Sequence, residues 1–115
     1  MPTILAPALQ TFAVHLLTAG GATFEEASRV GRSLVDANLR GYESHGVMRI
    51  PYYVQAIVDG EVVPRAEFTI TKQSPTHVVA DANWGFGQVQ ADRLLEQLAD
   101  RSHASGVGVG TMIHS

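Results

Sequence analysis

Three side chains that can do chemistry lie within six residues of one another in the first half of the sequence. Ser44 carries a hydroxyl, His45 an imidazole and Arg49 a guanidinium. In a coiled backbone, residues four apart project from one face, so His45 and Arg49 are expected to share a site. An imidazole can carry a proton, and a guanidinium can bind a carboxylate through two parallel hydrogen bonds. The pattern therefore predicts an enzyme that acts on a small carboxylic acid beside its acid group.

The residues around this trio restrict the backbone that presents it. Gly41 can end a preceding helix, which would let Ser44 cap a new turn that begins at His45. Pro51 cannot donate a hydrogen bond to Val47, so it either begins a second helical segment or kinks a continuous helix. The sequence leaves both of these alternatives open.

The trio belongs to a longer motif. Residues 41–53 read GYESHGVMRIPYY, residues 60–64 read GEVVP, and the similarity continues through residues 81–88 and 106–115. The motif resembles the N-terminal signature of the type 2 malate/L-lactate dehydrogenase family. That family also contains ureidoglycolate and sulfolactate dehydrogenases and diketogulonate reductase. Because the resemblance covers nearly the whole chain, it implies that residues 1–115 are the N-terminal portion of a longer, here incomplete, enzyme.

The resemblance implies a role for each member of the trio. His45 would be the proton donor and acceptor, Ser44 would relay to it, and Arg49 would bind the substrate carboxylate. The reaction would be the reversible oxidation of a 2-hydroxy acid to a 2-oxo acid by NAD or NADP, in a homodimer when the enzyme is full length. The acidic partner of His45 and the cofactor-binding segments are expected beyond Ser115, so no cofactor-binding residue is assigned and the chain alone is expected to be inactive.

Composition narrows the class of protein. The chain has 115 residues, 45% of them hydrophobic and 17% charged, with a net charge of −3 and no cysteine. These values are typical of one globular domain, and without a basic cluster neither nucleic acid nor an anionic membrane is an expected partner. No apolar run is long enough for a membrane span and no secretory signal begins the chain, so the cytoplasm is the expected location. The other histidines lack the spacing of metal ligands, so no metal is expected.

The spacing of apolar residues along the rest of the sequence predicts the helices and strands that would position the trio. Apolar spacing predicts helices over residues 5–18, from a capping box at Thr23 and Glu26 to about Leu39, over 52–59, and from Gln88 to about 103. Alternation predicts a β-hairpin from residues 68–72 and 77–81, and a buried strand over 106–113. The glycines of this strand share one face and would let another backbone or a ligand come close. The fold class is α/β: N-terminal helices, a hairpin, a helix and the start of a larger sheet. The resemblance implies a fold specific to the family and not a standard Rossmann fold.

Two competing interpretations accompany these predictions. Gly85 and Gly87 suggest a phosphate loop, but Gln90 stands where the Rossmann pattern needs its third glycine, which favours a tight strand-to-helix turn. The alternative to an enzyme is a small helical interaction or dimerisation module without catalysis, in which His45 and Arg49 are incidental surface residues.

Overall fold

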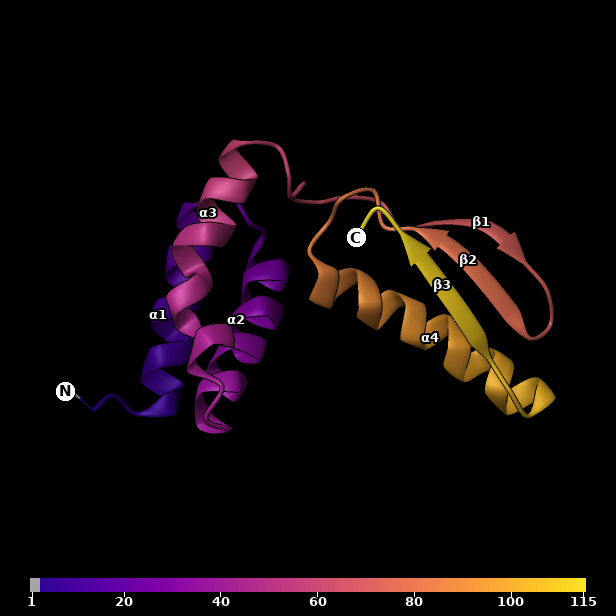
Figure 1. The fold of residues 1–115 in the computed structure, drawn as a ribbon, viewed down its shortest axis with the longest axis horizontal. Helices are drawn as coiled ribbons and strands as arrows, with labels where there is room; N and C mark the ends of the chain where they lie inside the picture. Colours follow the sequence, from indigo (N-terminus) through magenta and orange to yellow (C-terminus); the bar gives the residue numbers. More distant parts are fainter. Residues whose placement is uncertain (1–2) are drawn as a thin grey trace. The chain divides into compact units, whose positions relative to one another are not determined.

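A computed structural model describes residues 3–115 and contains four α-helices and a three-stranded sheet, so the α/β prediction is confirmed (Figure 1). The chain forms two compact units, with a boundary between Pro64 and Arg65. Composition suggested one domain, and no segment rich in glycine or serine marks this boundary. Each unit has its own buried residues and is described separately.

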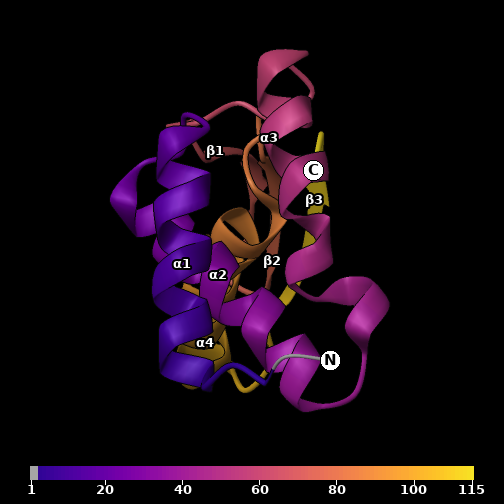
Figure 2. The ribbon, with the colours of Figure 1, turned by 90° about the vertical axis from the view of Figure 1, so that its left-hand side faces the viewer.

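The first unit is built from three α-helices and two single 3-10 turns. These elements are α1 (Ala6–Ala19), α2 (Phe24–Leu39), η1 (Glu43–His45), η2 (Val47–Arg49) and α3 (Ile50–Val58). Helix α1 packs against both α2 and α3 (Figure 2), and both 3-10 turns contact α2. The contacts between the helices bury small and branched apolar side chains: Ala13, Leu17, Ala27, Val30, Leu34, Val35, Ile50 and Ala56. The predicted helices are therefore confirmed, with ends that differ by one or two residues.

Both ends of α2 follow from its sequence. Thr23 accepts a hydrogen bond from the backbone N–H of Glu26, and the Glu26 carboxylate accepts one from the Thr23 N–H, so the predicted capping box is confirmed. At the other end, the N–H of Gly41 donates to the carbonyl of Asn38, and that of Tyr42 donates to Ala37. This is the Schellman pattern, and it requires the positive φ of 83° that Gly41 adopts. The glycine thus turns the chain back beside α2 directly before Ser44.

The second unit contains the sheet and one long helix. Strands β1 (Thr69–Gln73) and β2 (His77–Asp81) form the predicted antiparallel hairpin, with an irregular register between Ile70 and Lys72. Helix α4 (Gly87–Ser105) then leads to β3 (Val109–Ile113), which pairs in parallel with β2. A parallel neighbour needs such a crossover, because the chain must return to the end of the sheet at which β2 began.

The last strand is less buried than the sequence predicted. Gly108 and Gly110 share one face, where an added Cβ would press on Leu98 and Leu94 of α4, so the expected close approach is confirmed. On the opposite face, Val109 is 54% exposed and Ile113 is 43% exposed. The expectation of a buried strand was wrong for this face, because α4 covers only one side of β3. Within residues 3–115, β3 lies at one edge of the sheet. An edge position is what we expect of a strand in a sheet that continues further.

Candidate active site

The predicted trio lies on two separate turns. Ser44 and His45 belong to η1, Arg49 ends η2, and Gly46 between the turns is extended, with φ −95° and ψ −154°. The prediction that Ser44 caps a turn beginning at His45 was therefore wrong, since His45 is the last residue of its turn and its N–H donates to the carbonyl of Tyr42. Without one continuous coil, the spacing of four residues no longer places His45 and Arg49 on a common face.

Asn38 of α2 explains why the backbone changes direction at Gly46. Its side-chain Oδ1 accepts a hydrogen bond of 2.9 Å from the backbone N–H of Val47. Gly46 is buried against the same amide, and a Cβ at this position would overlap it. The glycine therefore permits a close approach that fixes the turn following His45, and Asn38 is a supporting residue that the motif alone did not indicate.

In the described part of the chain, the imidazole of His45 has a hydrogen-bond partner at only one of its two nitrogens. Its Nδ1 lies 2.9 Å from the hydroxyl oxygen of Ser44, and both side chains are exposed. In the described part of the chain, no group is hydrogen-bonded to Nε2. A hydroxyl can donate to an unprotonated Nδ1 or accept from a protonated one, so Ser44 suits either tautomer of His45. The geometry leaves Nε2 free to exchange a proton with a bound molecule.

Arg49 lies at the start of α3 and is half-buried. Its guanidinium carbon lies 5.7 Å from the centre of the Tyr52 ring, a cation–π distance, and no carboxylate in residues 3–115 pairs with it. Pro51 lies within the first turn of α3, so of the two alternatives it begins a helix and does not kink one. Tyr52, the side chain that Arg49 contacts, is not one of the residues that the motif predicted for the site.

His45 lines a shallow depression beside α2. The depression has a volume of about 450 Å³ and is formed by Ser33, Asp36, Ala37, Arg40, Tyr42 and His45. Arg49 is not among these residues, so the cation that shares the depression with His45 is Arg40. The motif indicated Arg49, which follows His45, and did not indicate Arg40, because the turn at Gly41 brings the end of α2 back beside η1.

A larger hollow in the same unit carries no comparable chemistry. It has a volume of about 630 Å³, and its lining is apolar apart from the Gln55 side chain: Leu9, Phe12, Leu16, Ala19, Gly20, Val47, Met48, Ile50, Pro51, Val54 and Gln55. No titratable side chain faces it, so it lacks the groups needed to move a proton. The smaller depression beside His45 is therefore the better candidate for an active site.

The glycine loop before α4 does not fit the phosphates of a nucleotide. A Cβ at Gly85 would press on Ala66 and on the side-chain amide of Gln90. Gln90 is 1% exposed, and its Nε2 donates a hydrogen bond of 2.8 Å to the carbonyl of Ala82. The space that a phosphate cradle would need is thus filled by the protein itself, and the tight-turn interpretation of this loop agrees with the structure.

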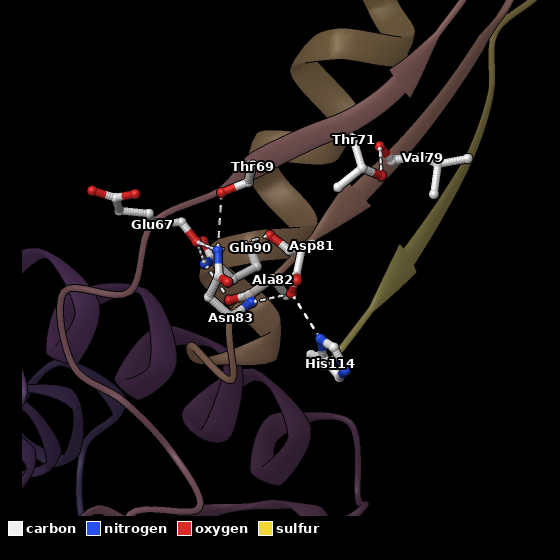
Figure 3. Close-up of polar contacts among 9 residues, drawn as sticks. All are labelled: Glu67, Thr69, Thr71, Val79, Asp81, Ala82, Asn83, Gln90 and His114. Atoms are coloured by element: carbon white, nitrogen blue, oxygen red, sulfur yellow. Dashed lines mark hydrogen bonds and ion pairs between the residues drawn. The ribbon is translucent and has the colours of Figure 1, made fainter.

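A polar cluster outside the predicted trio lies at the carboxyl ends of β2 and β3 (Figure 3). Asp81 Oδ1 accepts a hydrogen bond of 2.8 Å from the Asn83 N–H and lies 3.0 Å from His114 Nδ1. The Asn83 hydrogen bond is the main cause of the lowered pKa of Asp81; contact with His114 lowers this pKa further, and partial burial opposes the shift. The His114 ring lies 4.9 Å from the Trp84 ring, measured between their centres. The cluster joins two strand ends, and nothing in the sequence pattern indicated it.

The described residues contain neither a metal-ligand cluster nor a helix that could span a membrane. Across residues 3–115, no three histidine, aspartate or glutamate side chains are grouped as a metal site would require. None of the helices within that range has the length and apolar character needed to cross a membrane.

Comparison with known proteins connects this geometry to a family. The model of the family described as "Malate/L-lactate dehydrogenase" matches residues 4–115. The chain is 34% identical to malate dehydrogenase from Pyrococcus abyssi over 101 residues, which cover 88% of the chain and 28% of the relative. It is also 34% identical to L-sulfolactate dehydrogenase from Methanocaldococcus jannaschii over 96 residues, which cover 84% and 28%. The chain thus spans about 28% of the length of these relatives.

A solved structure shows the same fold. Malate dehydrogenase from Pyrococcus horikoshii superposes with a TM-score of 0.92 at 32% identity, and the match covers 96% of this chain and 32% of that one. The arrangement of helices and sheet described above is therefore one that this dehydrogenase also contains.

Proposed function

This chain belongs to the malate/L-lactate dehydrogenase family, and from this premise we propose that it forms the N-terminal part of an NAD- or NADP-dependent 2-hydroxy acid dehydrogenase. The names of its relatives support this class of substrate, because malate and sulfolactate are both 2-hydroxy acids. The lengths of the relatives support the view that the active enzyme is longer than 115 residues, with the short chain inactive alone. A homodimer, which rests on the family resemblance only, and a location in the cytoplasm, which rests on the sequence only, complete the proposal.

His45 is the proposed acid and base of the reaction. The observation that carries this assignment is the contact of 2.9 Å between Ser44 Oγ and His45 Nδ1, with Nε2 left unbonded in residues 3–115. During oxidation, Nε2 takes the proton of the substrate hydroxyl while the protonated Nδ1 donates to Ser44. During reduction, Nε2 returns the proton to the oxygen of the 2-oxo acid. Ser44 acts through His45 and is a positioning residue.

Arg49 is the proposed ligand of the substrate carboxylate. Its guanidinium has no carboxylate partner in the described chain, and Tyr52 restricts its position through ring contact. A fixed guanidinium can bind a carboxylate through two parallel hydrogen bonds. Such binding would hold the adjacent C2 and its hydroxyl in a constant position relative to His45.

The nicotinamide cofactor would accept the hydride that leaves C2. The loop at Gly85 does not fit its phosphates, and the groups that residues 3–115 would supply are those that move the proton and bind the carboxylate.

The test is an assay of the intact enzyme that carries this sequence. Purified protein is mixed with L-malate, L-lactate, ureidoglycolate or L-sulfolactate and with NAD or NADP, and nucleotide reduction is followed by absorbance. We expect saturable reduction with at least one acid and much slower reduction with the corresponding amide. No reduction with any acid, together with saturable self-association, would favour the interaction module.

A further inference from the structure

Arg40 and His45 line one depression although they come from different elements. Arg40 follows the last residue of α2, and His45 ends η1. Tyr42 lines the same depression from the start of η1. A hollow of about 450 Å³ falls within the usual size of small-molecule sites. The depression therefore combines a proposed proton carrier with a permanent positive charge.

The ion pair of Arg40 leaves most of its guanidinium available. Asp36 Oδ2 lies 3.0 Å from Arg40 Nε. No other side-chain contact of Arg40 occurs within residues 3–115, so its two terminal nitrogens are without a protein partner there. A guanidinium held through Nε still presents two parallel N–H donors, which is the geometry that binds a carboxylate or sulfonate. Asp36 thus orients the Arg40 guanidinium and leaves the edge with its two terminal nitrogens open to a ligand.

A solely structural role accounts for only part of this arrangement. A cation at the end of α2 and an i, i+4 ion pair both stabilise a helix slightly. Side-chain exposures of 71% for Arg40 and 55% for Asp36 make the pair a weak contributor. Neither effect requires Arg40 to share a depression with the imidazole of His45.

We propose that Arg40 binds a second anionic group of the substrate, so that the enzyme prefers 2-hydroxy acids with two acidic groups, a dicarboxylate or a sulfonated acid, to those with one. This inference rests on the proposed function and adds the substrate class. Arg49 binds the carboxylate next to the reacting carbon, and Arg40 binds the group at the far end. His45, which lines the depression together with Arg40, acts on the hydroxyl.

The test compares Arg40→Gln with Arg32→Gln in the intact enzyme. Arg32 is an exposed arginine of α2 that does not line the depression. In Arg40→Gln, kcat/KM for L-malate should fall about 10- to 100-fold, the scale of a lost hydrogen bond to a charged group, while L-lactate changes less than about threefold. Arg32→Gln should leave both values near those of the wild type. Equal losses with malate and lactate in Arg40→Gln would overturn the proposal.

The unmodified enzyme provides a measurement that does not depend on the folding of a variant. Its kcat/KM for L-malate or L-sulfolactate should exceed that for L-lactate by about tenfold or more. A wild-type preference for lactate would overturn the role of Arg40 while leaving the dehydrogenase proposal intact. Absence of activity with all three acids would instead overturn the proposed function, and the role of Arg40 with it.

Discussion

Asn38 and Val47 connect α2 to the turn that follows His45. The Asn38 side-chain oxygen accepts a 2.9 Å hydrogen bond from the Val47 N–H, and Gly46 packs against the same amide. This contact explains the glycine of the Ser-His-Gly motif physically, because any larger residue would displace Asn38. The orientation of His45 depends on a residue seven positions earlier in the sequence.

Replacing Gly46 should therefore damage both stability and activity. Gly46→Ala is expected to lower the free energy of unfolding by about 1–3 kcal/mol, the usual cost of overpacking, and to lower kcat because the η1 turn shifts. Urea unfolding and steady-state kinetics measure the two effects. Gly87→Ala is the matched control, since nothing lies within 4 Å of a Cβ at that position. Equal stability of the two variants would contradict the role of Asn38.

Removing the hydroxyl of Ser44 should slow the reaction without weakening substrate binding. Ser44 lies 2.9 Å from His45 Nδ1 and orients the ring. Ser44→Ala is expected to lower kcat by roughly tenfold, less than loss of the base itself, with KM little changed. Ser44→Thr keeps a hydroxyl and should recover much of the lost kcat. Wild-type kcat in Ser44→Ala would show that the contact has no part in the chemistry.

Arg49→Lys tests carboxylate recognition. Lysine keeps the charge but lacks the planar fork, so kcat/KM should fall by about tenfold or more for carboxylate substrates. The loss should be smaller for any amide or ester analogue that the enzyme accepts. The measurement is the ratio of kcat/KM between the wild type and Arg49→Lys, determined once with a carboxylate substrate and once with such an analogue. Equal losses with both would mean that Arg49 supports only the fold, for example through Tyr52.

The Asp81 cluster predicts a pH dependence of stability. Because the pKa of Asp81 is lowered in the folded chain, chiefly by the Asn83 N–H, its charge stabilises the fold above the ordinary aspartate pKa. This contribution is lost as the pH falls through the lowered value. Asp81→Asn should therefore be less stable than the wild type near neutral pH, and the difference should shrink below about pH 4.

Urea unfolding at several pH values measures this difference. Asp100→Asn is the control, because Asp100 is an exposed carboxylate of α4 with no hydrogen-bond partner in the described chain. A stability gap between the wild type and Asp81→Asn that stays constant down to pH 3 would contradict the role of the Asp81 charge.

Local signals predicted the elements of this fold well. The capping box at Thr23 begins α2 and the glycine at position 41 ends it. Each involves only a few neighbouring residues, so both could be predicted from the sequence. The alternating glycines before and within β3 predicted a close approach by another backbone or a ligand, and α4 makes that approach. The exposure of Val109 could not be predicted in this way, because it depends on how many layers cover the sheet.

The site was predicted less completely than the fold. The residue types of the motif indicated His45, Ser44 and Arg49, but their arrangement depended on contacts made across the chain. The break at Gly46 follows from Asn38, and the depression beside His45 follows from the return of the chain after α2. Spacing along one assumed coil could not reveal either of these relationships.

Whether His45 carries the proton is measured by the kcat of His45→Gln in the intact enzyme, with its best 2-hydroxy acid at saturating nucleotide. Glutamine is polar and of similar length but cannot act as an acid or base at neutral pH. We expect kcat to fall by roughly 10²-fold or more, with the dissociation constant of the nucleotide unchanged. A variant that keeps the wild-type kcat would contradict the assignment of His45 as the proton carrier.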